Sequence, residues 1–509
     1  MEYILTADGS KKIDSYCIEN LKIPSAVLME RAAYSVYEKL FVKECMGADN
    51  FKNASFTFIA GVGNNGGDAL CLARIMFQKK FNVNVYIAGD MNKLSTDNKL
   101  QAEILENIGV KIENIDTEEK VTDIKFGNVI VDGIFGISLN REVKGLYKKV
   151  IEKINESKKY VIALDVPSGL NATSGSVCGE SVKADITFTF GYIKSGLILC
   201  KGKDYSGKII KTDIGFDKKA LDNLILTENT VYMGITKDDL KNKLPKRLET
   251  GNKGSYGKLK IIAGSEKMSG AAYLSSFAAM KSGIGMAYVY THKNNLSILK
   301  TLIPEGIIDD YENEFEINES DVVLIGPGLS VNEKSKELVE KVLDKKCFAV
   351  IDADGINIIA KYNLQKKLHE KTVITPHIKE MERLKNSGNK NEKNVEYIRE
   401  NILKVAIEFA KEYNCVVVLK DSTTVISDRD STYINLSGNS GMASAGSGDV
   451  LAGILGAMLI QTLDVKNAAV LSAFIHGLAG DLKAMELSKE SLMASDIIYG
   501  LSDVFKIKK

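Results

Sequence analysis

Apolar positions in the first half of the chain fall into short, nearly continuous runs separated by longer amphipathic segments. The runs predict strands at residues 55–60, 83–88, 129–132, 160–165 and 184–190. The amphipathic segments predict helices at residues 10–20, 24–42, 99–108 and 144–154. Apolar strands that alternate with helices predict a parallel sheet with helices on both faces.

The second half shows the same alternation without repeating the sequence of the first. Its apolar runs predict strands at residues 259–263, 286–290, 322–325, 349–352, 372–374 and 415–420. Two long apolar helices are predicted at residues 449–461 and 466–480. Each half therefore predicts an α/β domain of its own.

The join between the halves is marked by two polar stretches. Residues 218–229 and 249–256 flank a short segment that ends at Pro245. A chain of 509 residues is long for one domain and ordinary for two. We predict a first domain at 1–217, a linker at 218–231 and a second domain at 232–509.

Composition excludes several classes of partner. The chain is 45% hydrophobic and 26% charged with a formal net charge of +1, and it has no basic stretch long enough to follow a phosphate backbone. Its seven cysteines form no CxxC pair, which favours reduced thiols. The N-terminus lacks a signal-peptide core, and no apolar run reaches the length of a membrane span. We predict a cytoplasmic protein that binds neither nucleic acid nor membrane.

The clearest motif of the first half follows its first predicted strand. The sequence GVGNNGGD runs from Gly61 to Asp68, where glycine and asparagine allow positive φ and close approach of a ligand to the backbone. Asp68 could bond ribose hydroxyls. The alternative is a tight connection without a ligand, which is common for a single glycine-rich turn.

Two further strands of this half end in acidic motifs. Asp132 opens DGIFG, and Asp165 opens DVPSG, which contains Ser168. If these strands are neighbours of the first, Asn65, Asp132 and Ser168 could supply oxygen ligands to one cation. The alternative is that such residues only cap loops and helices.

The second half carries its own glycine-rich motif, GNSGMASAGSGD, directly before the apolar helix at 449–461. The N–H groups of Gly446, Ser447 and Gly448 would form an anion hole for a phosphoryl group at the start of that helix. Asp449 would take a proton from an attacking hydroxyl, and we expect it to stay ionised. The alternative is a capped, glycine-rich helix entry without chemistry.

Other strand ends of this half add polar or glycine loops to one wall of the same cleft. They are GPG at 326–328, DADGIN at 352–357, TPH at 375–377 with Glu380, and KDSTT at 420–424. The last of these could hold nucleotide phosphates, and the position of His377 after a strand and Pro376 favours a contact with the ligand.

The motifs GVGNNGGD, VDGIFG and LDVPSG, in this order, resemble the NAD(P)H-hydrate epimerase domain over about residues 1–217. The resemblance implies that the hydrated dinucleotide contacts Asn64, Asn65, Gly66, Gly67, Asp68, Gly136, Ile137, Ser138 and Leu139. It implies a potassium ion at Asn65, Asp132 and Ser168. It also implies a catalytic role for Asp165, as the group that lends and recovers a proton.

The second set of motifs, NKGSYG, IAGS, GPGL, DADGIN, TPH, LKDSTT and GNSGMASAGSGD, resembles NAD(P)H-hydrate dehydratase of the ribokinase-like superfamily over about residues 232–509. The nucleotide residues so implied are Lys420, Asp421, Ser422, Thr423, Thr424, Gly446, Ser447 and Gly448. Gly328 and His377 are implied to face the hydrate, with Asp449 as the catalytic base. Asn252 stands where the family usually has histidine, and Asp421 where it usually has glycine.

Together the resemblances imply a two-domain α/β enzyme, Rossmann-like and then ribokinase-like, that repairs NADHX and NADPHX, the hydrated forms of NADH and NADPH. It would epimerise the R and S hydrates and dehydrate the S form with ADP and Mg²⁺, giving AMP and phosphate. We expect small-molecule partners and a homo-oligomer. Two alternatives stay open: a vitamin-precursor kinase fused to a dinucleotide-binding domain, and a nucleotide sensor without turnover. Retention of Asp165 and Asp449 argues against the sensor.

Overall fold

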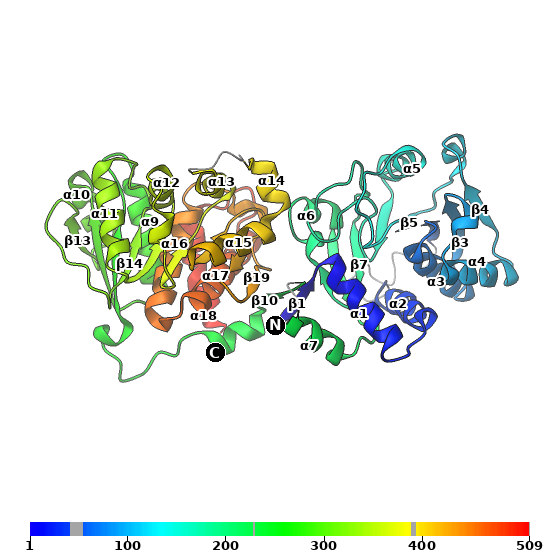
Figure 1. Cartoon of the computed structure of the whole chain (residues 1–509), viewed down its shortest axis with the longest axis horizontal. Helices are drawn as coiled ribbons and strands as arrows, with labels where there is room; N and C mark the ends of the chain where they lie inside the picture. The colour runs from blue at the N-terminus through cyan, green and yellow to red at the C-terminus, as the bar shows by residue number, and fades with distance from the viewer. Residues whose placement is uncertain (41–53, 228–229, 388–392, 508–509) are drawn as a thin grey trace. The chain divides into compact units, whose positions relative to one another are not determined.

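The chain forms two compact units, Tyr3–Tyr232 and Met233–Lys509, the second of which includes Met1 and Glu2 (Figure 1). The computed structural model describes residues 1–40, 54–227, 230–387 and 393–507. The end of the helix predicted at 24–42 lies outside the described residues. The two units are treated separately below.

The N-terminal unit is built on a parallel sheet in the order β4-β3-β2-β5-β6-β7-β9. Its strands are β2 (Ser55–Ala60), β3 (Asn82–Ala88), β4 (Ile112–Ile115), β5 (Val129–Gly133), β6 (Tyr160–Leu164), β7 (Ile186–Phe190) and β9 (Lys208–Thr212). The central strands β2, β5 and β6 are almost wholly buried, because helices cover both faces of the sheet.

Alternate strand residues send their side chains to two separate cores. Phe56 and Phe58 of β2 pack on one face with α2 (Ser25–Leu40), α3 (Asn64–Gln78) and α4 (Thr96–Asn107). Ile59 of the same strand packs on the other face with α5 (Gly145–Glu156). The short helix α6 (Gly202–Ser206) lies between β8 and β9 in the chain.

Residues 218–231, predicted as a linker, belong to the N-terminal unit. They contain α7 (Lys218–Thr227), whose Ala220, Leu221 and Leu224 pack against α1 (Ala7–Glu19) in a small apolar core. The polar composition of this stretch hid one apolar helix face. The neighbouring strand β1 (Glu2–Leu5) pairs in parallel with β8 (Ile193–Lys194).

The C-terminal unit has a second, mainly parallel sheet in the order β13-β12-β11-β14-β15-β16-β17-β18-β19-β10. Its strands are β10 (Val231–Gly234), β11 (Lys258–Ile262), β12 (Met286–Thr291), β13 (Ile307–Asp310), β14 (Val322–Ile325), β15 (Phe348–Ile351), β16 (Thr372–Ile374), β17 (Val416–Leu419), β18 (Val425–Ser427) and β19 (Thr432–Ile434). The β17-β18-β19 segment is antiparallel, and the other pairs are parallel.

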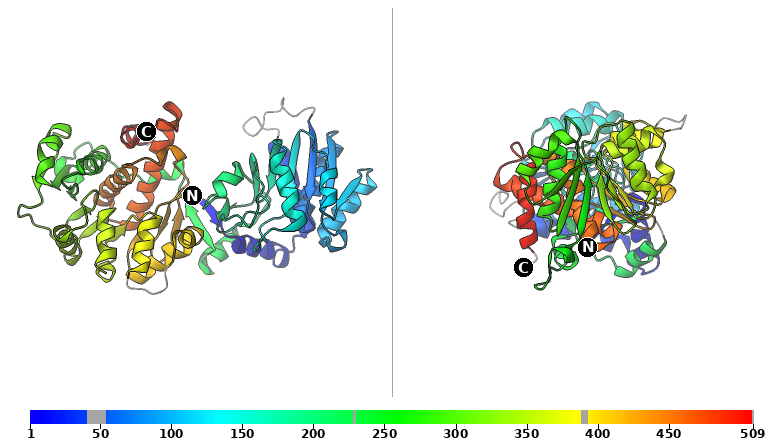
Figure 2. Two further views of the ribbon diagram at one scale, coloured as in Figure 1. Left: turned by 90° about the horizontal axis from the view of Figure 1, so that it is seen from above. Right: turned by 90° about the vertical axis from the view of Figure 1, so that its left-hand side faces the viewer.

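Helices cover this sheet as well, and Figure 2 shows the strands of each unit lying between them. The large core holds α8 (Lys237–Lys243), α9 (Ser269–Lys281), α16 (Ser447–Thr462), α17 (Val465–Glu486) and α18 (Ala494–Lys506). The remaining helices are α10 (Leu296–Leu302), α11 (Glu333–Asp344), α12 (Asp354–Lys361), α13 (Ile378–Asn386), α14 (Val395–Glu400) and α15 (Ile402–Tyr413). Among the described residues only α17 is long and apolar enough to cross a membrane, and 67% of its apolar window is buried in the core.

The predicted α/β class is confirmed in both units. The strands at 55–60, 322–325 and 372–374 match the structure residue for residue. The strands β1, β4, β8, β9, β10, β13, β18 and β19 were not predicted, because most are short and carry charged residues that mask their apolar pattern.

Candidate active sites

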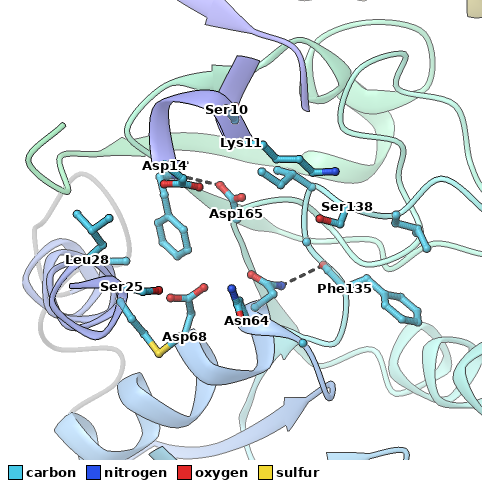
Figure 3. Close-up of a pocket in the computed structure, with 18 of the residues that line it drawn as sticks. Ser10, Lys11, Asp14, Ser25, Leu28, Asn64, Asp68, Phe135, Ser138 and Asp165 are labelled. Carbon is cyan, nitrogen blue, oxygen red and sulfur yellow. Dashed lines mark hydrogen bonds between the residues drawn. The ribbon is translucent and has the colours of Figure 1, made fainter. Parts of the chain in front are cut away.

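The three motif strands of the N-terminal unit lie side by side, in the order β2, β5, β6. Because they are parallel, their motifs meet at one edge of the sheet. A cavity of about 830 Å³ opens there (Figure 3). Its lining includes the predicted residues Asn64, Asn65, Asp68, Gly136, Ile137, Ser138, Leu139 and Asp165.

The glycine-rich motif at 61–68 has a different backbone conformation from the one predicted. Asn64 to Asp68 form the first turn of α3 rather than a loop, and none of the motif's glycines has positive φ. Glycine is needed for close packing instead: a Cβ on Gly66 would lie 2.0 Å from the carbonyl oxygen of Gly61, and one on Gly61 would lie 2.0 Å from that of Ile134. Gly66 and Gly67 are buried and do not line the cavity.

Asp165 lies at the end of β6 in a left-handed conformation, with φ of 61°. Its side chain is nearly buried, and Oδ1 accepts a hydrogen bond from the N–H of Phe190 at 3.1 Å. The same oxygen accepts a very short contact from the ammonium of Lys194, which is 2% exposed and also donates to Phe190 O at 2.7 Å. These donors suit a carboxylate, and such strained backbone is typical of functional positions.

Two of the three residues predicted to hold a cation, Asn65 and Ser168, contact the carbonyl of Phe135, and the third, Asp132, is hydrogen-bonded to Ser168. Ser168 donates from Oγ to Asp132 Oδ1 at 2.6 Å and from N to Asp132 Oδ2 at 2.8 Å. Asn65 Nδ2 donates to Phe135 O at 3.0 Å, and Ser168 Oγ lies 3.3 Å from the same oxygen. Burial raises the pKa of Asp132 to about 6, and hydrogen bonds from Ser168 and Ile134 oppose that rise.

Asp14 and Lys194 also line this cavity, although the sequence did not single them out. Burial raises the pKa of Asp14 to about 6; Lys194 opposes the rise and Asp165 adds to it. Burial, followed by the charges of Asp165 and Asp14, raises the pKa of Asp68 well above its usual value. Asp14 falls within a helix that was predicted, but its burial depends on how that helix packs.

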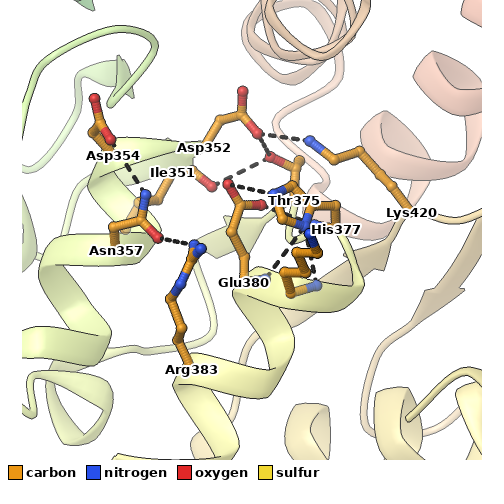
Figure 4. Close-up of polar contacts among 10 residues, drawn as sticks. Ile351, Asp352, Asp354, Asn357, Thr375, His377, Glu380, Arg383 and Lys420 are labelled. Atoms are coloured by element: carbon orange, nitrogen blue, oxygen red, sulfur yellow. Dashed lines mark hydrogen bonds and ion pairs between the residues drawn. The ribbon is translucent and has the colours of Figure 1, made fainter. Parts of the chain in front are cut away.

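In the C-terminal unit, Lys420 is the centre of a charged cluster at the strand ends (Figure 4). Its Nζ donates to Asp352 Oδ1 at 2.9 Å, and the hydroxyl of Thr375 donates to the same oxygen at 2.5 Å. Burial disfavours the charge of Lys420, but Asp352 and Glu380 outweigh burial and raise its pKa. A Cβ on Gly448 would lie 3.4 Å from this Nζ, so the ammonium is close to the start of α16.

Asp449 lies in the first turn of α16, where the helix dipole favours negative charge. Burial nevertheless raises its pKa to about 7; Asp352 adds to the rise and Lys420 opposes it. Burial therefore disfavours the ionised form that the sequence led us to expect for this carboxyl.

The predicted anion hole is smaller than the motif implied. Gly446 is the N-cap of α16, with φ of 88°. The N–H of Ser447 donates to Ser444 O at 3.3 Å, which leaves the next amides of the first turn to face a ligand. Ser447 Oγ lies 3.3 Å from Nε2 of His476, a residue of α17 that sequence reasoning missed. Burial lowers the pKa of His476 to about 4.

His377 and Glu380 form the N-terminal capping box of α13. His377 Nδ1 accepts from the N–H of Lys379 at 3.0 Å, and Glu380 Oε2 accepts from the N–H of His377 at 2.8 Å. Burial raises the pKa of Glu380 to about 7, against the opposing charge of Lys420. A parallel β-bridge joins the backbones of His377 and Lys420, so both residues lie just after neighbouring strands.

Asp421 and Asn252, the two residues that differ from the family pattern, each have hydrogen-bond partners nearby. Asp421 accepts hydrogen bonds from Arg399, at 3.0 Å from Nε and 3.4 Å from Nη2, so its charge in the loop at 420–424 is balanced. Asn252 caps the turn at Lys253–Tyr256 by accepting from the N–H of Gly254 at 2.9 Å. Gly328, with φ of 59°, packs against Ala271 and Met268, where a Cβ would lie 2.8 Å from each.

Comparison with known proteins covers both units. A family described as YjeF-related protein N-terminus matches residues 25–196, and one described as NAD(P)H-hydrate dehydratase matches residues 259–501. The bifunctional NAD(P)H-hydrate repair enzyme of Moorella thermoacetica is 33% identical, over 97% of this chain and 95% of its own length. That of Thermofilum pendens is 34% identical, over 95% of this chain and 92% of its own length.

The chain belongs to the family of bifunctional NAD(P)H-hydrate repair enzymes. The Escherichia coli member of this family is 32% identical, over 88% of this chain and 84% of its own length. Among solved structures, ADP/ATP-dependent NAD(P)H-hydrate dehydratase of Bacillus subtilis, co-crystallised with ATP and Mg²⁺, is 29% identical with a TM-score of 0.48. The match covers 54% of this chain and 98% of the chain of the Bacillus subtilis protein.

Proposed function

We propose that the chain repairs hydrated nicotinamide dinucleotides in two steps. The N-terminal unit interconverts the R and S hydrates, and the C-terminal unit dehydrates the S hydrate with ADP as phosphoryl donor. Membership of the repair family supports the pair of activities. The observation that carries the proposal is that the chain has a cavity with Asp165 in one unit and the Asp449–Lys420–Asp352 cluster in the other.

Dehydration needs a better leaving group than hydroxide, and phosphorylation supplies one. Asp449 would accept the proton of the hydrate hydroxyl as its oxygen attacks the terminal phosphorus of ADP, with release of AMP. Phosphate then leaves with the C–O electrons, and the ring nitrogen's lone pair assists. Loss of a proton from the neighbouring carbon restores the dihydropyridine.

The phosphate groups would be held by Lys420 and by the amides of the first turn of α16. An ammonium and helix N-terminal N–H groups stabilise the charge that moves through the transferring phosphoryl group. Asp352 and Thr375 position the ammonium through the contacts given above. Gly328 and His377 would face the hydrate, while Ser422, Thr423 and Thr424 would complete the nucleotide loop.

A Mg²⁺ ion fits this site only with help from the nucleotide. No group of three or more His, Cys, Asp or Glu residues able to hold a metal occurs among the described residues. Mg²⁺ usually keeps water and phosphate ligands, so ADP itself would bring most of its oxygens. When bound, the ion would neutralise charge on the phosphates.

A monovalent cation fits the N-terminal unit. Asp132 is a fully buried carboxyl whose bonded partners are Ser168 and the N–H of Ile134, with no cationic side chain among them. Asp132, Ser168 and the carbonyl of Phe135 offer hard oxygens within one hydrogen-bonded group, to which Asn65 is joined through its Nδ2. We propose that K⁺ binds there and compensates the buried charge while it fixes the loop after β5.

The proposed function predicts full repair of a mixture of both epimers. With ADP, Mg²⁺ and K⁺, the absorbance of the reduced cofactor should return to completion from mixed R- and S-NADHX, and faster with ADP than with ATP at equal Mg²⁺. The measurement is absorbance against time, with phosphate and AMP quantified at the end.

The alternatives give different results in this assay. A stable phosphorylated hydrate would identify a kinase, and nucleotide binding without turnover would identify a sensor. A faster reaction with ATP would contradict the choice of donor while leaving the dehydration intact.

Epimerisation should depend on potassium. Replacing K⁺ by a large organic cation should slow interconversion of purified S-NADHX without nucleotide, as followed by chromatography. Asp132→Asn should weaken the apparent K⁺ affinity by at least the roughly 10–100-fold that follows loss of an outer-shell partner in metal sites. The control is dehydration of the S epimer by the same protein, which should not change. Equal epimerisation rates with and without K⁺ would contradict the cation site.

A further inference from the structure

Asp14 enters the epimerase cavity from α1, far in sequence from the glycine and acidic motifs. It lines the same cavity as Asp165 and Asp68, and Figure 3 shows the three carboxyl groups directed into one space. The hydrogen bonds of Asp165 come from Lys194, Phe190 and Thr189. Asp14 is not among these donors, and its carboxyl lies beside that of Asp165 at the wall of the cavity.

The charged groups around Asp14 and Asp165 are shared unequally between the two carboxyl groups. The charged and titratable groups that face it are Lys194 of β8, Asp165 after β6, Asp68 of α3, and Lys11 and Cys17 of α1. Lys194 gives its hydrogen bonds to Asp165 and to Phe190 O, so Asp165 takes the one buried positive charge of this group. Two neighbouring carboxyl groups in different environments are the usual arrangement for a paired acid and base.

We infer that Asp14 is a further catalytic residue of the epimerase, acting as the acid that complements Asp165. The inference rests on the proposed epimerase function. The Asp14 carboxyl donates its proton to the hydroxyl on the ring carbon, the C–O bond breaks, and water departs as the ring nitrogen's lone pair forms a C=N bond. Water then adds to either face of that planar carbon, and Asp165 takes the proton it releases. No electrons leave the substrate, and exchange with solvent removes the proton from Asp165 and returns one to Asp14.

This assignment predicts a specific pH dependence. Burial raises the pKa of Asp14 to about 6, and an acid works only in its protonated form, so epimerisation should slow as pH rises through that value. Asp14→Asn copies the shape of the protonated carboxyl but holds no transferable proton. We expect it to lower kcat about 10²-fold near pH 6, the lower end of the effect of a positioned acid, and to remove the alkaline limb of the pH profile.

The experiment uses the full chain, R-NADHX and no nucleotide, with the uncatalysed rate subtracted at each pH. Asp14→Glu should recover part of the rate because it restores a carboxyl. Asp8→Asn is the matched control, since Asp8 is an exposed carboxylate of the same helix and pairs with Lys12. Dehydration of S-NADHX with ADP confirms that the C-terminal unit of each variant is folded, and recovery in Asp14→Glu shows the same for the N-terminal unit.

Two results would overturn the inference: an Asp14→Asn rate close to wild type, or an alkaline limb that persists in that variant. The inference is supported if Asp14→Asn loses both rate and the alkaline limb of the pH profile, while Asp14→Glu recovers part of the rate and Asp8→Asn does not change it. Failure of the proposed function gives a different result, because the wild-type protein itself would then not interconvert the epimers.

Discussion

Asp449→Asn should abolish dehydration while it leaves the fold, ADP binding and epimerisation in place. Asparagine keeps the shape and a capping oxygen at the first turn of α16, but it cannot take the proton of the hydrate hydroxyl. Loss of a positioned base costs about 10²–10⁴ in rate. The measurement is the return of NADH absorbance from S-NADHX with ADP and Mg²⁺.

The pH profile tests the same assignment independently. A base works in its ionised form, and burial raises the pKa of Asp449 to about 7, so wild-type dehydration should rise with pH through that value. Asp449→Asn should lack this rise. Near-normal dehydration by a folded variant that binds ADP would refute the mechanism and direct attention to Glu380, whose pKa is raised to a similar value.

Asp165→Asn should remove epimerisation with an effect of similar size, about 10²–10⁴ in rate. Asparagine is the better replacement here because Asp165 has φ of 61°, a conformation that asparagine tolerates and alanine does not. The assay follows interconversion of purified S-NADHX by chromatography without nucleotide. Dehydration of that epimer with ADP should continue at the wild-type rate.

Asp165→Asn also removes one partner of the buried Asp165–Lys194 ion pair, so loss of stability must be separated from loss of catalysis. Removing one partner of such a pair costs about 3–5 kcal/mol, because Lys194 would be left buried without its carboxylate. The double variant Asp165→Asn, Lys194→Met restores neutrality and should regain thermal stability without regaining epimerisation. A double variant that epimerises normally would show that Asp165 has only a structural role.

The sequence predicted the strand ends well because their apolar runs are unambiguous. Asn65, Asp132 and Asp165 follow such runs in the N-terminal unit, and its parallel strands bring these residues to one edge of the sheet. The local backbone was harder to predict: the spacing could not show that Asn64 begins a helix or that the N–H of Ser447 already has a partner.

Residues brought in by tertiary packing gave no sequence signal. Asp14 lies in an amphipathic helix beside the buried residues Ile13 and Cys17, where a carboxylate resembles one of many on a solvated face. Lys194 is one of 67 basic residues, and its two-residue strand has no periodicity to detect. The cationic partner of Asp421 gave no signal either, because Arg399 lies 22 residues away in the separate helix α14.

The capping box of α13 decides which tautomer His377 adopts. Its Nδ1 accepts hydrogen bonds from two backbone amides, and burial lowers the pKa of the ring, so the single proton of the neutral imidazole lies on Nε2. That nitrogen lies 3.5 Å from Oε1 of Glu380, so it can donate there or to a ligand oxygen, but it has no lone pair to receive a proton. Of the two side chains in the box, only Glu380 could therefore replace Asp449 as a proton acceptor, and His377 would act as a polarising donor toward the carboxamide or hydroxyl of the hydrate.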